Sequence, residues 1–141
     1  MWNYLWPVLV VIGANTFYNI AAKSTPQNVN SFASLVVTYL VAAFLAMVLF
    51  FITSPNKNLM SEFSKINWTS IVFGIAIVAL EFGYINLYRA GWKVSVGSLV
   101  TNIGLACVLL IVGVLLYKEV ISLRQMIGMA ICAVGLILIS K

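Results

Sequence analysis

The chain alternates long apolar stretches with short polar connections. Five of these stretches come close to the roughly 20 residues that a helix needs to cross a bilayer. They span residues 4–22, 31–52, 68–88, 95–117 and 123–140. Open sheets do not occur in lipid, and no segment shows the alternation typical of a membrane barrel. The pattern therefore predicts five transmembrane helices.

The connections between these helices are short and polar. Residues 23–30 join the first pair, and residues 53–58 contain strong turn signals. Residues 59–66 follow as a short amphipathic segment, in which Glu62 and Lys65 have the i, i+3 spacing of a helical ion pair. We expect this segment to lie at the membrane interface.

The composition agrees with this architecture. Of the 141 residues, 63% are hydrophobic and 8% are charged, whereas charged residues make up about a quarter of a typical soluble domain. We therefore expect an all-α membrane protein, with residues 1–141 as a single five-helix domain that crosses the cell (inner) membrane several times. The basic residues are scattered and form no stripe for nucleic acid.

The loop charges do not favour one orientation. With five crossings, the basic residues on the N-terminal side are Lys57, Lys65, Lys118 and Arg124, and those on the other side are Lys23, Arg89, Lys93 and Lys141. The eight residues divide evenly, although an excess on one side normally sets the topology. Either a weak bias is overridden during insertion, or the chain inserts in both orientations and pairs antiparallel.

Glu81 is the residue that least suits its surroundings. At about 1.5 Å per residue it lies roughly 19 Å beyond Trp68 and roughly 12 Å before Arg89, far from both ends of the third helix. A charged side chain at such a depth costs at least about 2.5 kcal/mol, so a functional role is the default interpretation.

Other residues share the helix face of Glu81. The set with helical spacing is Gly74, Ile77, Glu81, Tyr84 and Tyr88. A carboxylate beside two phenols could receive a proton or a cation, since aromatic faces attract organic cations. The alternative is a neutral Glu81 that only hydrogen-bonds to a neighbouring helix.

Two further helices carry polar faces. The residues are Asn15, Tyr18 and Asn19 on the first helix, and Ser95, Ser98 and Asn102 on the fourth. Such groups can simply hold helices together, each contributing about 0.6–2 kcal/mol. They could instead converge with Glu81 on one cavity. The substrate and proton pathway would then be lined by Glu81, Asn15, Tyr18, Asn19, Tyr84, Tyr88 and Asn102.

The fifth helix has a different character. Gly128, Cys132 and Gly135 form a stripe of small residues, which is typical of helix packing or a dimer contact. Ser122 and Gln125 have the spacing of a capping box at the start of this helix.

The sequence offers no residues for catalysis. It lacks His, its three acidic residues are far apart, and it has no glycine loop for phosphate. We therefore predict no enzymatic activity, no cofactor and no metal site.

The end of the chain resembles the EamA-type repeat of the drug/metabolite transporter superfamily. The pattern E-x-L-x-x-x-Q-x-x-G is matched by Glu119, Gln125 and Gly128, with Ile121 in the Leu position and Gly135 as a later glycine. Larger relatives carry two five-helix repeats in opposite orientation. The resemblance therefore implies that this single-repeat chain pairs with a second copy as an antiparallel homodimer.

The resemblance also bears on which residue could couple transport to the movement of protons. Small multidrug resistance proteins, which are four-helix relatives, carry an essential Glu in the first helix, where this chain has Asn15. Any proton coupling in this chain would therefore fall to Glu81, which lies on a different helix.

The combined interpretation is a secondary transporter of a small metabolite or organic cation. Its partners would be a second copy of the chain, the lipid bilayer and the small-molecule substrate, which would bind near the midplane between inverted chains. Two alternatives stay open: a non-transporting membrane subunit of a larger complex, and half of a lipid-linked sugar flippase that pairs with a different chain.

Overall fold

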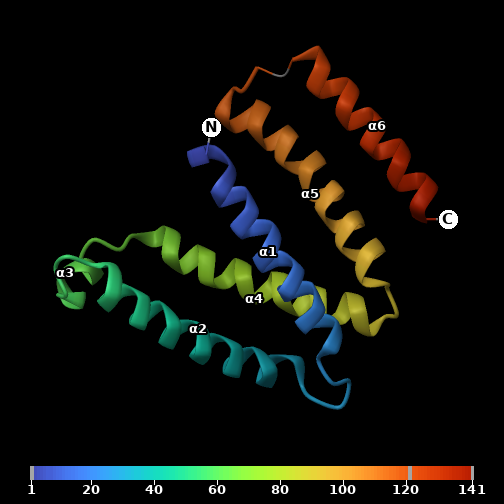
Figure 1. The fold of residues 1–141 in the computed structure, drawn as a ribbon. Helices are drawn as coiled ribbons and strands as arrows, with labels where there is room; N and C mark the ends of the chain where they lie inside the picture. The colour runs from blue at the N-terminus through green and yellow to red at the C-terminus, as the bar shows by residue number, and fades with distance from the viewer. Residues whose placement is uncertain (1, 121, 141) are drawn as a thin grey trace. The chain divides into compact units, whose positions relative to one another are not determined.

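A computed structural model describes residues 2–120 and 122–140. The all-α class is confirmed over this part of the chain, which contains helices and no strand (Figure 1). The helices are α1 (Trp2–Ser24), α2 (Ser31–Thr53), α3 (Leu59–Phe63), α4 (Trp68–Arg89), α5 (Val94–Tyr117) and α6 (Leu123–Ser140). Each predicted apolar stretch corresponds to one long helix, and the predicted amphipathic segment contains α3.

Four of the helices are long and apolar enough to cross a membrane, namely α1, α2, α4 and α5. Helix α6 has 18 residues, or roughly 27 Å at 1.5 Å per residue, slightly less than a hydrocarbon core of about 30 Å. The fifth crossing therefore stays a prediction. So does the side on which Lys141 emerges, because Lys141 lies outside the described residues.

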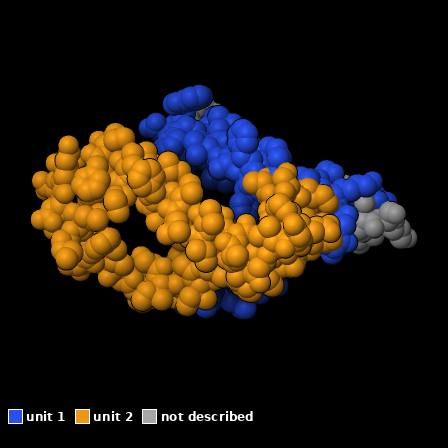
Figure 2. Space-filling model, turned by 90° about the horizontal axis from the view of Figure 1, so that it is seen from below, with its two compact units in different colours: residues 1–20, 90–141 blue, residues 21–89 orange. Residues whose placement is uncertain are grey.

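The chain divides into two compact units, which Figure 2 shows in different colours. Unit 1 comprises Met1–Ile20 and Ala90–Lys141, and unit 2 comprises Ala21–Arg89. Unit 1 thus holds most of α1 together with α5 and α6. Unit 2 holds the end of α1 together with α2, α3 and α4.

In unit 2, α2 packs against α4. The Phe32 ring near the start of α2 stacks on the Phe82 ring in the later part of α4, with centroids 4.7 Å apart, so the two helices run antiparallel. Leu35 is buried on α2 and Ile85 on α4. Most other apolar side chains are open, including Phe73 at 71% exposure. This pattern is expected where lipid, not water, surrounds the helices.

Arg89, the last residue of α4, forms hydrogen bonds with the loop between α1 and α2 and with the start of α2. Its guanidinium donates to the Ser31 hydroxyl at 2.7 Å and to the carbonyls of Pro26 and Val29 at 2.8 and 2.7 Å. A cation at this position also interacts favourably with the negative end of the α4 dipole. One side chain therefore holds the loop, the start of α2 and the end of α4 together.

We expect Arg89→Ala to lower the free energy of unfolding by about 2–3 kcal/mol, because hydrogen bonds to a charged donor contribute more than neutral ones. Arg89→Lys should restore only part of this stability, since an ammonium group does not present a planar fork of donors. Unfolding in detergent micelles, followed by tryptophan fluorescence, measures both changes. Lys93→Ala is the control, because the Lys93 side chain makes no capping hydrogen bond at the start of α5. Equal destabilisation by Lys93→Ala would contradict the role of Arg89.

The two ends of unit 2 carry basic residues. At one end, the Lys23 ammonium donates to the Tyr88 carbonyl at 3.3 Å, beside Arg89. This contact brings Lys23 and Arg89 to the same end of unit 2, and their placement on one side of the membrane stays a prediction. At the connection between α2 and α4, Lys65 pairs with Glu62 at 2.6 Å, so the predicted i, i+3 ion pair is confirmed.

In unit 1, α5 and α6 form a hairpin (Figure 1). Lys118 caps α5 with a left-handed backbone, φ 53°, and the Glu119 N–H donates to the Gly113 carbonyl at 3.0 Å. The Ser122 N–H donates to the Gln125 side-chain oxygen at 2.8 Å, and the Gln125 N–H donates to the Ser122 hydroxyl at 3.3 Å. The predicted capping box before α6 is therefore confirmed.

Candidate functional site

Glu81 lies on the buried face of α4. Its exposed fraction is 9%, and Ile85 and Tyr88, one and two turns further along, are also buried. Tyr84 is half-buried, with its ring centroid 6.1 Å from that of Tyr88. The helix therefore places these polar groups close together, as the spacing predicts. Gly74, in the same predicted stripe, is open, because an added Cβ would meet no atom of the described residues within 4 Å.

Tyr39 on α2 is the neighbour of Glu81 that the sequence did not predict. Its hydroxyl oxygen is buried, and it lies close enough to the Glu81 carboxyl for the two groups to interact electrostatically. Among the described residues this hydroxyl makes no hydrogen bond of ordinary geometry, so the pair is a near contact and not a fully formed bond.

Tyr88 already has a cationic neighbour inside unit 2. The Lys23 ammonium lies 5.8 Å from the Tyr88 ring centroid, within the range of a cation–π interaction. The same ammonium donates to the Tyr88 carbonyl. An organic cation would have to compete with Lys23 for this ring.

A second polar site lies within unit 1, between α1 and α5. Its volume is about 390 Å³, and it is lined by Ile12, Asn15, Thr16, Asn19, Ile20, Val94, Ser95, Ser98 and Asn102. The predicted polar faces of the two helices therefore converge on one cavity. Tyr18 is half-buried on α1 and is not among the lining residues. Glu81, Tyr84 and Tyr88 belong to unit 2.

The α1 side of this cavity is ordered by its own amide groups. The Asn19 side-chain amide donates to the backbone carbonyl and to the side-chain oxygen of Asn15, each at 2.8 Å. Thr16 lines the same cavity but was not predicted as a site residue. The available signal was its spacing of three residues before Asn19, which places both on one helix face.

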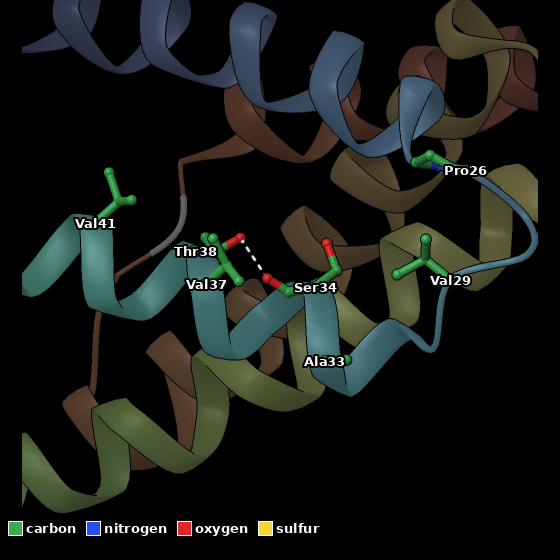
Figure 3. Close-up of a pocket in the computed structure, with 7 residues that line it drawn as sticks. All are labelled: Pro26, Val29, Ala33, Ser34, Val37, Thr38 and Val41. Carbon is green, nitrogen blue, oxygen red and sulfur yellow. Dashed lines mark hydrogen bonds between the residues drawn. The ribbon is translucent and has the colours of Figure 1, made fainter.

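A larger groove in unit 2 has a different chemistry (Figure 3). Its volume is about 710 Å³, and it is lined by Pro26, Val29, Ala33, Ser34, Val37, Thr38 and Val41. The Thr38 hydroxyl donates to the Ser34 carbonyl of its own helix at 3.1 Å. Most of these described lining residues are aliphatic and none of them is charged, so we do not assign the polar substrate site to this groove.

The residues of the family-like motif meet around the turn between α5 and α6. A cavity of about 310 Å³ there is lined by Leu110, Glu119, Val120, Gln125, Gly128, Met129 and Cys132. The Glu119 carboxylate folds over α5, where an added Cβ at Gly113 would lie 2.6 Å from its oxygen. Ile121, the remaining motif position, lies outside the described residues.

No other part of the described chain packs closely against two glycines of the small-residue stripe on α6. A Cβ added at Gly128 or Gly135 would meet no described atom within 4 Å. Cys132 is a free, exposed thiol on the same helix. The predicted use of the stripe for helix packing or a dimer contact stays a prediction.

These features define the class of the molecule as a multi-pass helical membrane protein with carboxyl and amide groups inside its apolar helices. A family model for the EamA-like transporter family matches residues 1–141, and the chain belongs to this family. The resemblance noted at the turn between α5 and α6 is thereby confirmed, and with it a membrane transporter function in general terms. No curated protein and no solved structure gives a significant match.

Proposed function

We propose that the protein is a secondary transporter of a small metabolite or organic cation in the cell (inner) membrane, driven by protons through Glu81. Two copies in opposite orientation would enclose the substrate, and rocking of one copy against the other would expose it to each side in turn. In this scheme the chain performs no covalent chemistry and uses neither a cofactor nor a metal.

The burial of Glu81 in a membrane-spanning helix carries the proposal. A charged carboxylate at such a depth costs about 2.5–3.5 kcal/mol, and protonation removes this cost. Only 9% of the residue is exposed, and the Tyr39 hydroxyl lies beside it on the helix that packs against α4. Taking up or releasing a proton at Glu81 would therefore change the contact between α2 and α4. Asn or Gln would serve if the side chain only held the helices together.

The inverted homodimer has separate support in the sequence. The chain matches the EamA-like model once over its whole length, and many transporters are built from two inverted repeats. The even division of loop charges would allow one chain to supply both orientations. This arrangement also explains how a chain with an odd number of crossings could form a symmetric transporter. The two copies would be related by a two-fold axis that lies in the membrane plane.

We expect Tyr39→Phe to change the pH dependence of transport without abolishing transport. The substitution removes one hydroxyl and keeps the ring on α2, so the packing against α4 should survive while the near contact with Glu81 is lost. Initial uptake rates over a series of pH values measure the effect. Tyr4→Phe is the matched control, because Tyr4 is 86% exposed. An unchanged pH profile for Tyr39→Phe would remove Tyr39 from the site.

Self-sufficiency of the chain tests the proposal as a whole. The purified protein, reconstituted with no other polypeptide, should be a dimer and should take up substrate from a mixture of labelled small metabolites when a pH gradient is imposed. A strict requirement for a second, different chain would favour the flippase half or the non-transporting subunit.

A further inference from the structure

The cavity between α1 and α5 presents oxygen atoms that can only accept hydrogen bonds. The Thr16 hydroxyl donates to the Ile12 carbonyl at 2.8 Å, and the Ser98 hydroxyl donates to the Val94 carbonyl at 2.7 Å. A hydroxyl has one proton and two lone pairs, so each of these oxygens retains only acceptor capacity. A ligand facing them must therefore donate hydrogen bonds.

The same cavity also contains donors. Asn15 also lines the cavity, and its side-chain oxygen accepts from Asn19. The Asn15 amide nitrogen carries two protons that a ligand could accept. Asn102 adds a second carboxamide and Ser95 adds a hydroxyl, both from α5. A ligand that both donates and accepts would satisfy more of this lining than one that only donates.

None of the described residues that line this cavity is charged. Of the three acidic residues, Glu62 and Glu81 belong to unit 2, and Glu119 lines the cavity at the turn between α5 and α6. An ion moved from water into a site without a counter-charge loses far more solvation than a neutral polar molecule whose hydrogen bonds are matched. The lining therefore disfavours anions and cations.

We infer that this cavity binds a neutral polyhydroxylated metabolite. Hydroxyl groups of the ligand would donate to Thr16 and Ser98 and accept from Asn15 and Asn102, while Ile12 and its aliphatic neighbours would contact the carbon skeleton. A volume of about 390 Å³ suits a small molecule. This assignment rests on the proposed function and narrows its substrate class. The competing explanation is that these polar groups only bind a neighbouring copy of the chain.

Three open-chain molecules with six carbons isolate the effect of ligand charge. Sorbitol is neutral, 1-amino-1-deoxysorbitol is a cation and gluconate is an anion. Saturable binding of radiolabelled sorbitol to the purified, reconstituted protein should be observed, and unlabelled sorbitol should compete better than either charged analogue. Direct binding is preferred to a thermal shift, because polyols also stabilise proteins by exclusion from their surface.

A pair of threonine substitutions tests the location. Thr16→Val should weaken sorbitol binding about fivefold, the effect of losing one hydrogen bond. Thr38→Val is the matched control, because Thr38 makes the same bond to a carbonyl of its own helix but lies on α2, outside the cavity. It should leave sorbitol binding unchanged.

Three results would overturn the assignment: no saturable sorbitol binding, stronger competition by a charged analogue, or equal effects of Thr16→Val and Thr38→Val. Two further outcomes separate this assignment from the proposed function. Sorbitol binding without any pH-driven uptake would refute only the proposed transport mechanism. Uptake of another substrate without sorbitol binding would refute only the polyhydroxylated class.

Discussion

Glu81→Gln is expected to abolish pH-driven uptake in proteoliposomes. Gln has nearly the same shape as Glu and can hydrogen-bond to a neighbour, but it cannot take up or release a proton. Uptake driven by a pH gradient should therefore fall to the level of liposomes without protein. Exchange of substrate at equal pH should lose its dependence on pH.

The folded protein should tolerate this substitution. Glu81 is buried in a helix that we expect to cross the membrane, so its ionised form is a source of instability and not of stability. We expect the unfolding temperature of Glu81→Gln to equal or exceed that of the wild type. A loss of transport in a well-folded variant would then report on the proton and not on the fold.

Glu62→Gln is the matched control, because it makes the same change from a carboxylate to an amide at an exposed position. Glu62 lies on the short helix α3 and pairs with Lys65, with both side chains well exposed. Exposed ion pairs contribute little stability, about 0–1 kcal/mol. This variant should transport normally. If Glu81→Gln also transported normally with an unchanged pH profile, Glu81 would have no part in coupling.

The long helices were predictable because each needs only a continuous apolar stretch of membrane-spanning length. The contacts at two helix ends were also predictable, because they join residues that are close in the sequence. The capping box at Ser122 and Gln125 and the ion pair of Glu62 with Lys65 both depend on spacing within one turn. The loop contacts of Arg89 were not predictable, since they join residues about 60 positions apart in the chain.

The candidate site was predictable only within single helices. Glu81, Tyr84 and Tyr88 share a helix face through spacing, and Asn15 with Asn19 follows the same rule. Tyr39 was missed because its position next to Glu81 depends on how α2 packs against α4. Nothing in the apolar run around Tyr39 distinguishes a buried hydroxyl from an interfacial aromatic residue. The cavity of α1 and α5 shows the same limit, since the spacing identified two polar faces but did not pair them.

A shift in the balance of loop charges is expected to inactivate the protein in a way that a second variant can reverse. The pair Lys57→Gln with Arg124→Gln removes two positive charges from one predicted side, and the pair Lys93→Gln with Lys141→Gln removes two from the other. Each double variant leaves two basic residues facing four, which should fix a single orientation. A reporter at the C-terminus should then be active on only one side of the membrane, on opposite sides for the two variants.

Transport by these variants decides between the two explanations of the even charge balance. If the working unit is an antiparallel homodimer, each double variant alone should be inactive, because it supplies only one orientation, and co-expression should restore uptake. The matched control replaces Lys57 and Arg124 by Arg and Lys, respectively, which keeps the charge and should keep both orientations. Full activity of either double variant alone, or a wild-type reporter active on one side only, would rule out the inverted homodimer. In that case the weak charge bias is simply overridden during insertion, and a parallel assembly or a different partner chain must complete the transporter.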